Sequence, residues 1–356
     1  MIGKWKTWLG IAISIAAIAV AVRGVEWSEV WPALARADRG ILALIFVLSP
    51  IVNISVRAIR WKIFLRPAAR VSLAGATSAT AIGLMANNVL PARVGEFVRA
   101  YALGRRERVP VTTAFGGLFL ERLFDGLAVV GILYAVTWMH EFPDWVATTV
   151  RIAFYLFLGA LVFLLALMAR PAATVRLARR VTGRLTGGPL EDAVERFLAT
   201  LLDGFQLLRR PSLVLLSFVL ALFQWCLLTG LYWLGLVAFG IVDGVGWVGA
   251  FFVNCVATLG VAVPSSPGFV GTFEAFIVKS LEVFEVDRTL AFTYAAGFHA
   301  VSFIPTTLVG LAYFLRAGIS WGELERSGEH VEEELEEEFE EEIAADPHDG
   351  EAERST

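Results

Sequence analysis

Charged residues are scarce in this sequence. Only 18% of its 356 residues are Asp, Glu, Lys or Arg, whereas 57% are apolar, including 26 Phe and 11 Trp. A soluble domain of this length needs more charge to cover its surface. The composition therefore argues against a soluble protein and indicates a chain that is embedded in a membrane.

The sequence signals of several catalytic classes are also missing. There is no Gly-Lys-Ser/Thr phosphate-binding loop, which argues against an ATP-driven pump, and no Gly-x-Ser-x-Gly hydrolase elbow. The four histidines are scattered, so no zinc site is predicted. Cys226 and Cys255 lie in apolar segments, where buried thiols are expected rather than a disulfide framework. We predict no cofactor, no metal site and no nucleic-acid partner.

Long apolar runs are what the sequence has instead. A helix needs about 20 such residues to cross a hydrocarbon core of about 30 Å. Six runs come near this length or exceed it, at 8–22, 41–61, 111–138, 148–169, 211–239 and 290–315. The first run is expected to be an uncleaved helix rather than a signal peptide. The predicted fold class is an all-α polytopic membrane protein with about six transmembrane helices.

Basic residues predict the orientation of these helices, because short cytoplasmic loops collect Lys and Arg. The N-terminus and the segments 57–70, 99–108 and 170–210 are basic. Residues 323–356 carry 16 acidic and 2 basic side chains; subtracting them from the totals of 34 and 30 leaves 18 acidic and 28 basic before them. We predict a plasma-membrane protein with both termini in the cytoplasm and a disordered acidic tail.

Two apolar stretches do not fit as simple spans. Residues 71–98 run between two segments that both read as cytoplasmic, and Pro91 and Gly95 interrupt them. Residues 246–263 and 268–285 are separated by Pro264 to Gly268. Two re-entrant pairs of broken helices, 71–103 and 246–286, entering from opposite sides, resolve the charge pattern as an inverted repeat. An irregular bundle with two proline-kinked helices is the alternative.

The expected organisation follows from these spans. It consists of a transmembrane helix and outer loop (1–40), a first repeat (41–169), a basic cytoplasmic connector (170–210), a second repeat (211–316) and an acidic cytoplasmic tail (317–356). Broken helices of inverted repeats meet near the middle of the bilayer and form binding sites there. We therefore expect the functional side chains at the two breaks.

The first break holds Asn88, Arg93 and Glu96. A helix that begins near Arg93 to Glu96 presents free amide groups that favour an anion, and Arg93 can bind a phosphate in bidentate fashion. Glu96 is expected to pair with Arg93 or Arg99, each three residues away. The second break has similar chemistry: Pro267, Gly268 and Gly271 unwind the backbone, and Glu274 follows on the next helix.

The span 111–138 carries Glu121, Arg122 and Asp125 on roughly one face. Charges inside a membrane span normally face protein partners or a polar cavity, so this cluster either binds substrate or fixes helix packing. Arg57 is a further candidate for the site, whereas Arg60 is expected to snorkel to the interface. A further polar residue, His299, is expected to be a hydrogen-bonded packing residue rather than a proton relay.

The stretches 88–96, 121–125 and 267–274 together resemble the lysylphosphatidylglycerol synthase transmembrane region family of flippase-like proteins. Members with a soluble aminoacyltransferase domain make aminoacylated phosphatidylglycerol, and their membrane part is associated with its movement across the bilayer. The resemblance implies a translocation module without the synthase, because only an acidic tail follows Arg316. Related stand-alone members are linked to polyprenyl-linked sugars or other lipids.

Three functions remain open at this point. The leading hypothesis is a flippase or scramblase for an anionic, aminoacylated or polyprenyl-linked lipid, with a homo-oligomer or a partner synthase as possible partners. A membrane-embedded transferase acting on a lipid carrier is the alternative, in which acids near Arg serve as a general base. A non-transporting accessory subunit is the third.

Overall fold

The computed structural model describes residues 4–90, 94–169, 210–263 and 265–326. Within these ranges every regular element is a helix, which confirms the all-α prediction. Five segments are long and apolar enough to cross a membrane: Arg39–Leu65, Val146–Phe163, Pro211–Ala238, Val242–Ala262 and Arg288–Ala317. A bent pair, Trp8–Val22 with Trp27–Arg36, raises the number to as many as six. The connector 170–209 and the tail from residue 327 lie outside the described residues.

The segment after the first helix is not simply a loop, which corrects the expectation for residues 23–40. Helix α1 (Lys4–Val22) is followed by a second helix, α2 (Trp27–Arg36), bent by 82° from it. The side chains of Trp27 and Trp31 are 61% and 75% exposed. Exposed tryptophans on a short helix suit the boundary between lipid and water.

The next span consists of two helices in one rod. Its parts are α3 (Arg39–Pro50), a π-helical turn (Ile51–Ser55) and α4 (Val56–Leu65). Pro50 has no amide hydrogen to donate, and the turn that widens the helix begins directly after it. Within the turn, Asn53 Nδ2 donates to the carbonyl of Ser49 at 2.9 Å. Single π-helical turns of this kind often mark functional sites.

The first broken pair is α5 (Leu73–Val89) and α6 (Gly95–Glu107), close to the predicted boundaries. The two helices pack on each other through Gly83 and Gly95. A Cβ atom at Gly83 would lie 2.6 Å from the Gly95 carbonyl oxygen, and one at Gly95 would overlap the Gly83 carbonyl oxygen. The two glycines therefore permit the close approach of the α5 and α6 backbones.

The second broken pair is α12 (Val242–Ala262) and α13 (Thr272–Glu282). Helix α12 is kinked at Gly246, whose φ is +61°, and α13 is shorter than the sequence predicted, because it begins only after a 3₁₀ turn at Pro267–Phe269. Gly268 and Gly271 have φ angles of +70° and +92°, which side chains with a Cβ rarely adopt. The glycines therefore make the unwound segment possible.

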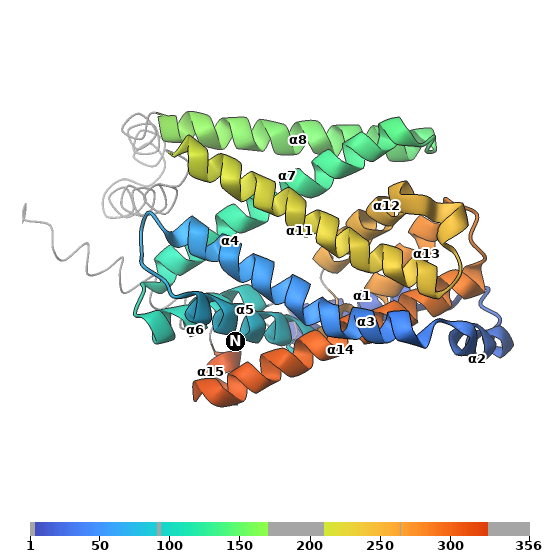
Figure 1. The fold of residues 1–356 in the computed structure, drawn as a ribbon, viewed down its shortest axis with the longest axis horizontal. Helices are drawn as coiled ribbons and strands as arrows, with labels where there is room; N and C mark the ends of the chain where they lie inside the picture. The colour runs from blue at the N-terminus through green and yellow to red at the C-terminus, as the bar shows by residue number, and fades with distance from the viewer. Residues whose placement is uncertain (1–3, 91–93, 170–209, 264, 327–356) are drawn as a thin grey trace, which may run out of the picture.

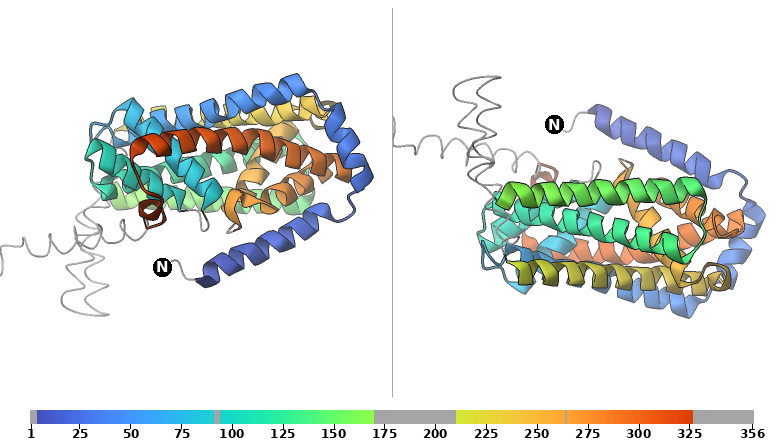
Figure 2. Two further views of the ribbon diagram at one scale, coloured as in Figure 1. Left: turned by 90° about the horizontal axis from the view of Figure 1, so that it is seen from below. Right: turned by 90° about the horizontal axis from the view of Figure 1, so that it is seen from above.

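Four long helices and one short helix complete the described structure. They are α7 (Val111–Met139), α8 (Asp144–Ala169), α11 (Pro211–Ala238), α14 (Arg288–Ala317) and α15 (Trp321–Glu325). With α1 and the α3–α4 rod, these long helices cover the six apolar runs of the sequence. Helix α8 packs on α7 at the edge of the bundle (Figures 1 and 2).

The two broken pairs lie toward opposite ends of the bundle, with α5 and α6 at one end and α12 and α13 at the other (Figure 1). One helix of each pair packs against a long helix of the other half, α5 against α14 and α12 against α7, whereas α6 and α13 pack against α7 and α14 of their own halves. The first rods of the two halves, α4 and α11, also pack on each other. Both halves thus place a broken pair between long helices of the two halves, and the inverted repeat stays a prediction.

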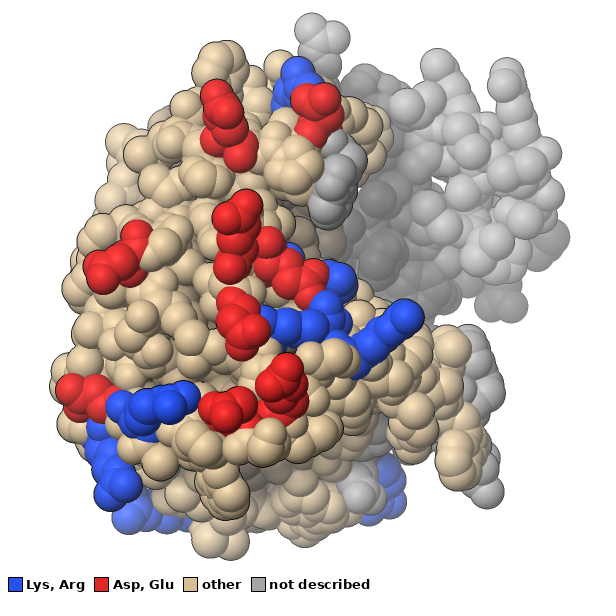
Figure 3. Space-filling model, turned by 90° about the vertical axis from the view of Figure 1, so that its right-hand side faces the viewer, with Lys and Arg blue, Asp and Glu red and all other residues tan. Residues whose placement is uncertain are grey.

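Charge differs between the two ends. Figure 3 views the end that carries α2 and α13, where acidic side chains are spread over the surface with basic ones among them; exposed acids there include Glu29, Glu141, Asp243 and Glu285. The opposite end holds the basic segments 66–70 and 105–108. Under the positive-inside rule the basic end faces the cytoplasm, so the predicted orientation matches this distribution and stays a prediction.

Candidate functional site

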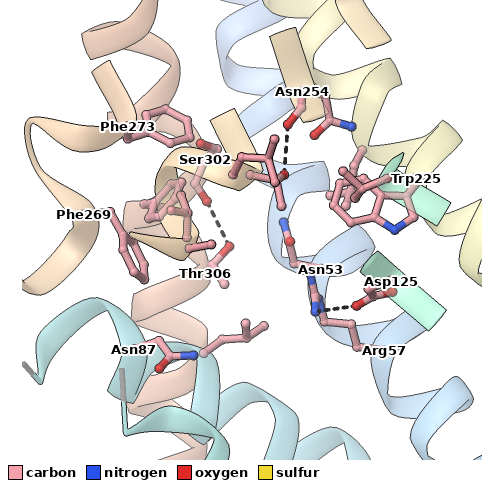
Figure 4. A pocket seen from close by; sticks show the side chains of 18 of the residues that line it. Asn53, Arg57, Asn87, Asp125, Trp225, Asn254, Phe269, Phe273, Ser302 and Thr306 are labelled. Carbon is pink, nitrogen blue, oxygen red and sulfur yellow. Dashed lines mark hydrogen bonds and ion pairs between the residues drawn. The ribbon is translucent and has the colours of Figure 1, made fainter. Parts of the chain in front are cut away.

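A cavity of about 430 Å³ lies inside the bundle, between the two broken pairs. Its volume is within the range of small-molecule sites. One part of its wall is charged and comes from α4, α6 and α7. The other part is mainly aromatic, as Figure 4 shows in part, and consists of Trp225, Tyr232, Phe269, Phe273, Phe298 and Phe303. The cavity therefore suits a ligand with a polar, charged end and an apolar remainder.

Arg60 is a fully buried charge beside this cavity. Its Nη1 donates to Asp125 Oδ1 at 2.6 Å and to Gln224 Oε1 at 2.7 Å, and its side chain is completely buried. The expectation that Arg60 snorkels to the interface is wrong. Paired charge on α7 holds the guanidinium inside the protein, where a lone charge would be very costly.

Arg99 is held in a similar way by Glu121. Its Nη1 and Nη2 lie 3.0 Å from the two carboxylate oxygens of Glu121, whose side chain is fully buried. The guanidinium also lies 4.3 Å from the ring of Trp61, a distance that allows a cation–π contact. Arg99 and Arg60 are thus committed to protein partners, and both fix α7 in position.

Arg57 and Arg122 line the cavity together with Arg99, and their side chains are more exposed than that of Arg99. The Arg57 Nη1 atom is 3.6 Å from Glu121 and 3.7 Å from Asp125, and its Nε has no hydrogen-bond partner among the described residues. The Arg122 side chain is 40% exposed, although its Nη2 binds Glu121 Oε1 at 2.9 Å. In Figure 4 Arg57 lies beside Asp125 at the charged part of the wall. Arg122 is thus the most exposed guanidinium group of the cavity wall, and Arg57 has only ion-pair distances of 3.6 Å or more, so we take these two as the candidates for binding a ligand.

The charged network is not balanced. Four guanidinium groups, those of Arg57, Arg60, Arg99 and Arg122, face three carboxylates, Glu96, Glu121 and Asp125. When all are ionised, one positive charge remains among these described residues. The indole Nε1 of Trp225, which also lines the cavity, has no described hydrogen-bond partner either. An anion in the cavity would offset this charge.

The start of α6 differs from the expectation of free amide groups. The amide of Gly95 donates to Asn87 Oδ1 at 2.8 Å, and Asn87 Nδ2 donates to Glu96 Oε2 at 3.2 Å. Of the two partners expected for Glu96, Arg99 binds Glu121 instead and Arg93 lies outside the described residues; the Glu96 carboxylate lies 3.9 Å from Arg122. Asn87 therefore caps the helix and orients Glu96 at the cavity wall.

The acid of the second break lies elsewhere. Glu274 Oε2 accepts from the amide of Gly271 at 2.6 Å, and Glu274 Oε1 is 2.5 Å from His299 Nδ1. Glu274 and Gly268 line a second, more open cavity of about 380 Å³ beside the central one. Asn88 and Phe303 line both cavities.

The structure thus divides the predicted site residues. The central cavity is lined by Arg57, Asn88, Glu96, Arg122 and Asp125, with Glu121 buried behind them. Gly268 and Glu274 line the second cavity, Pro267 and Gly271 belong to the break between the helices, and Arg93 lies outside the described residues.

Sequence reasoning missed four contributors, Arg60, Asn87, Arg99 and Gln224. The position of Arg99, three residues after Glu96, was visible in the sequence, but its partner Glu121 was not. Gln224 gave no signal, because one glutamine in an apolar helix has no defined spacing to a partner 164 residues away.

Comparison with known proteins identifies the family of this chain. A family model described as the lysylphosphatidylglycerol synthase TM region matches residues 7–310. The chain is 29% identical to "Glycosyltransferase AglD" of Haloferax volcanii over 87% of its own length and 54% of that protein. It is 22% identical to "UPF0104 membrane protein MJ1078" of Methanocaldococcus jannaschii, over 64% of this chain and 92% of that protein. The chain thus spans about half the length of AglD.

Proposed function

The chain belongs to the lysylphosphatidylglycerol synthase TM region family, and from this premise we propose that it translocates a membrane lipid whose headgroup contains a phosphate. The observation that carries the proposal is the unbalanced positive charge in the central cavity. Arg57 and Arg122 bind the phosphate there, as Arg does in bidentate fashion elsewhere. The aromatic part of the wall accommodates the apolar remainder of the lipid.

The other charges have supporting roles in this proposal. Arg60 and Arg99 hold Asp125 and Glu121 at fixed positions, 2.6 Å and 3.0 Å away. The two carboxylates in turn keep Arg57 within 4 Å of both of them. A phosphate that enters the cavity competes with these carboxylates for Arg57. Because of this competition the phosphate can bind to Arg57 and can also be released from it. A transported lipid has to do both.

Native mass spectrometry of the protein in mild detergent tests the binding step. We expect the wild type to retain an anionic lipid and Arg57→Gln to lose it. Arg36→Gln is the matched control, since the Arg36 side chain is 71% exposed on α2, and this variant should retain the lipid. Retention of the same lipids by all three proteins would contradict the assignment of the cavity.

Reconstituted vesicles test the transport step. We expect the wild type to move fluorescent phosphatidylglycerol between leaflets, as measured by the fraction that dithionite quenches from outside. Arg57→Gln and Arg122→Gln should slow this movement, whereas Arg36→Gln should not. Movement no faster than in protein-free vesicles would argue against translocation of this lipid.

A transferase acting on a lipid carrier is the second candidate, favoured by the relative named as a glycosyltransferase. Glu96 is the acid best placed for a general base, because its side chain is 23% exposed at the cavity wall. Formation of a glycosylated or aminoacylated lipid from a labelled donor by the purified protein, abolished in Glu96→Gln, would support this function instead.

A further inference from the structure

Glu274 and His299 are titratable partners at the second break, outside the central cavity. Oε1 of Glu274 lies 2.5 Å from Nδ1 of His299, and each side chain is only 11% exposed. Both line the second cavity, which is bounded by α5, the second break and α14. Among the described residues that line it, they are the only titratable ones. The pair is therefore reachable from an open cavity yet mostly withdrawn from water.

The neighbouring charged groups have other partners. On α13, Lys279 lies 2.7 Å from Glu282, and Arg288 of α14 also binds Glu282. On α12, Asp243 is exposed in the first turn and Cys255 is fully buried in the apolar core. Helix α1 meets the break through Ser14, whose hydroxyl accepts from the amide of Ser266 at 2.8 Å. Helix α5 contributes Asn88 to the wall of the second cavity, and an asparagine side chain is not titratable.

Charge determines what this pair can bind. With Glu274 ionised, Nδ1 of His299 donates to the carboxylate, and a neutral ring keeps Nε2 as its acceptor. The pair then carries one negative charge in a segment where uncompensated charge is costly. A proton taken up at Nε2 gives an imidazolium and a neutral ion pair. We infer that Glu274 and His299 form a proton-binding site that couples lipid movement to a proton gradient.

The structure offers a path for such coupling. Glu274 Oε2 also caps α13 by accepting from the Gly271 amide, so a change in charge on the pair acts on the end of the unwound segment. At the other end of that segment, a Cβ atom on Gly268 would lie 3.3 Å from the carbonyl oxygen of Asn88. Asn88 in turn lines the central cavity as well as the second one. Asn88 thus connects the cavity that holds the proton-binding pair with the cavity proposed for the headgroup.

The inference of coupling rests on the proposed translocation, but proton binding can be measured alone. We expect the His299 ring nitrogens, assigned in ¹⁵N NMR by comparison with His299→Gln, to report proton uptake on the ring when the pH of the sample is varied. Glu274→Gln keeps an oxygen for the Gly271 cap, so it should fold, and it should alter this proton uptake, because the ring loses its carboxylate partner. A His299 ring that stays in one protonation state at every pH at which the protein is folded would overturn the proton site.

Coupling is then measured in vesicles with fluorescent phosphatidylglycerol and an imposed gradient of about one pH unit. If one proton moves per lipid, the distribution between leaflets should shift by up to about tenfold. Glu274→Gln and His299→Gln should still move the lipid without a gradient but lose the shift. His140→Gln, a histidine after the end of α7, is the control and should respond like the wild type.

The outcomes separate the two proposals. Lipid movement that ignores the gradient in the wild type would overturn coupling and leave translocation standing. A titrating His299 without any lipid movement would leave the proton site standing and count against the proposed translocation of this lipid.

Discussion

Arg60 and Asp125 join α4 to α7 through a contact of 2.6 Å that is almost completely shielded from water. The same guanidinium reaches Gln224 on α11, so a single side chain links three helices at the charged wall of the cavity. Arg60 and Asp125 are 65 positions apart in the sequence. This contact positions α7 and, with it, the charged side chains of Glu121 and Arg122. The cavity can bind a ligand through its charged wall only when this contact is in place.

Replacing Arg60 by Ala should be severely destabilising. The change leaves Asp125 buried beside the cavity without its closest partner, and breaking a buried pair in this way costs about 3–5 kcal/mol. Thermal unfolding in detergent measures the effect. Arg36→Ala removes an exposed contact of 3.9 Å to Glu29 and should cost about 1 kcal/mol or less. Equal stability of the two variants would mean that the buried contact does not hold α7.

Replacing Gly95 by Ala should separate the first broken pair. The added methyl group meets the Gly83 carbonyl oxygen and the Asn87 side chain, and overpacking of this kind costs about 1–3 kcal/mol. The measurement is the unfolding temperature together with retained lipid. Gly131→Ala in α7 is the control, because nothing lies within 4 Å of the new methyl group. That variant should be stabilised by about 0.5–1 kcal/mol, and destabilisation of both would point to a general intolerance of alanine.

Docking of α15 should depend on pH. Hydrogen bonds from Ser320, together with Arg105 at 2.5 Å, lower the pKa of Glu323 to about 2. Because the pKa is depressed, the stabilisation is complete above the ordinary glutamate value of about 4.3 and is lost as pH falls toward 2. Hydrogen exchange of residues 320–326, corrected for intrinsic rates, should show no change from pH 7 to about 5 and faster opening below. Glu323→Gln should remove this dependence, and a pH response that survives in the variant would exclude Glu323 as its cause.

The two ends of the bundle should be accessible from opposite sides of the membrane. Single cysteines at Glu29 in α2 and at Arg106 in α6, in a background without Cys226 and Cys255, report on each end. A membrane-impermeant maleimide added to intact cells should label the first and spare the second until the cells are lysed. Labelling of both positions from outside, or in the reverse order, would refute the predicted orientation.

The sequence by itself determined the membrane class and the positions of both breaks. A span needs a minimum length of apolar residues, and a break needs proline or glycine, so both are local properties that a reader of the sequence can see. In the first pair, α5 accordingly ends at Val89 and α6 begins at Gly95, close to the predicted break. In the second pair α12 ends at Ala262 and α13 begins only at Thr272, because residues 267–269 form a turn of their own.

Only the tertiary structure decided which charges share a site. Arg60, expected at the interface, is buried because Asp125 and Gln224 reach it from two other helices. Glu274, expected beside the arginines, faces a different cavity because the turn of the second break directs it toward His299. Spacing along one helix specifies a face but not the neighbour that covers it. The partner of a buried charge depends on how separate helices pack, and that is settled only when the whole bundle folds.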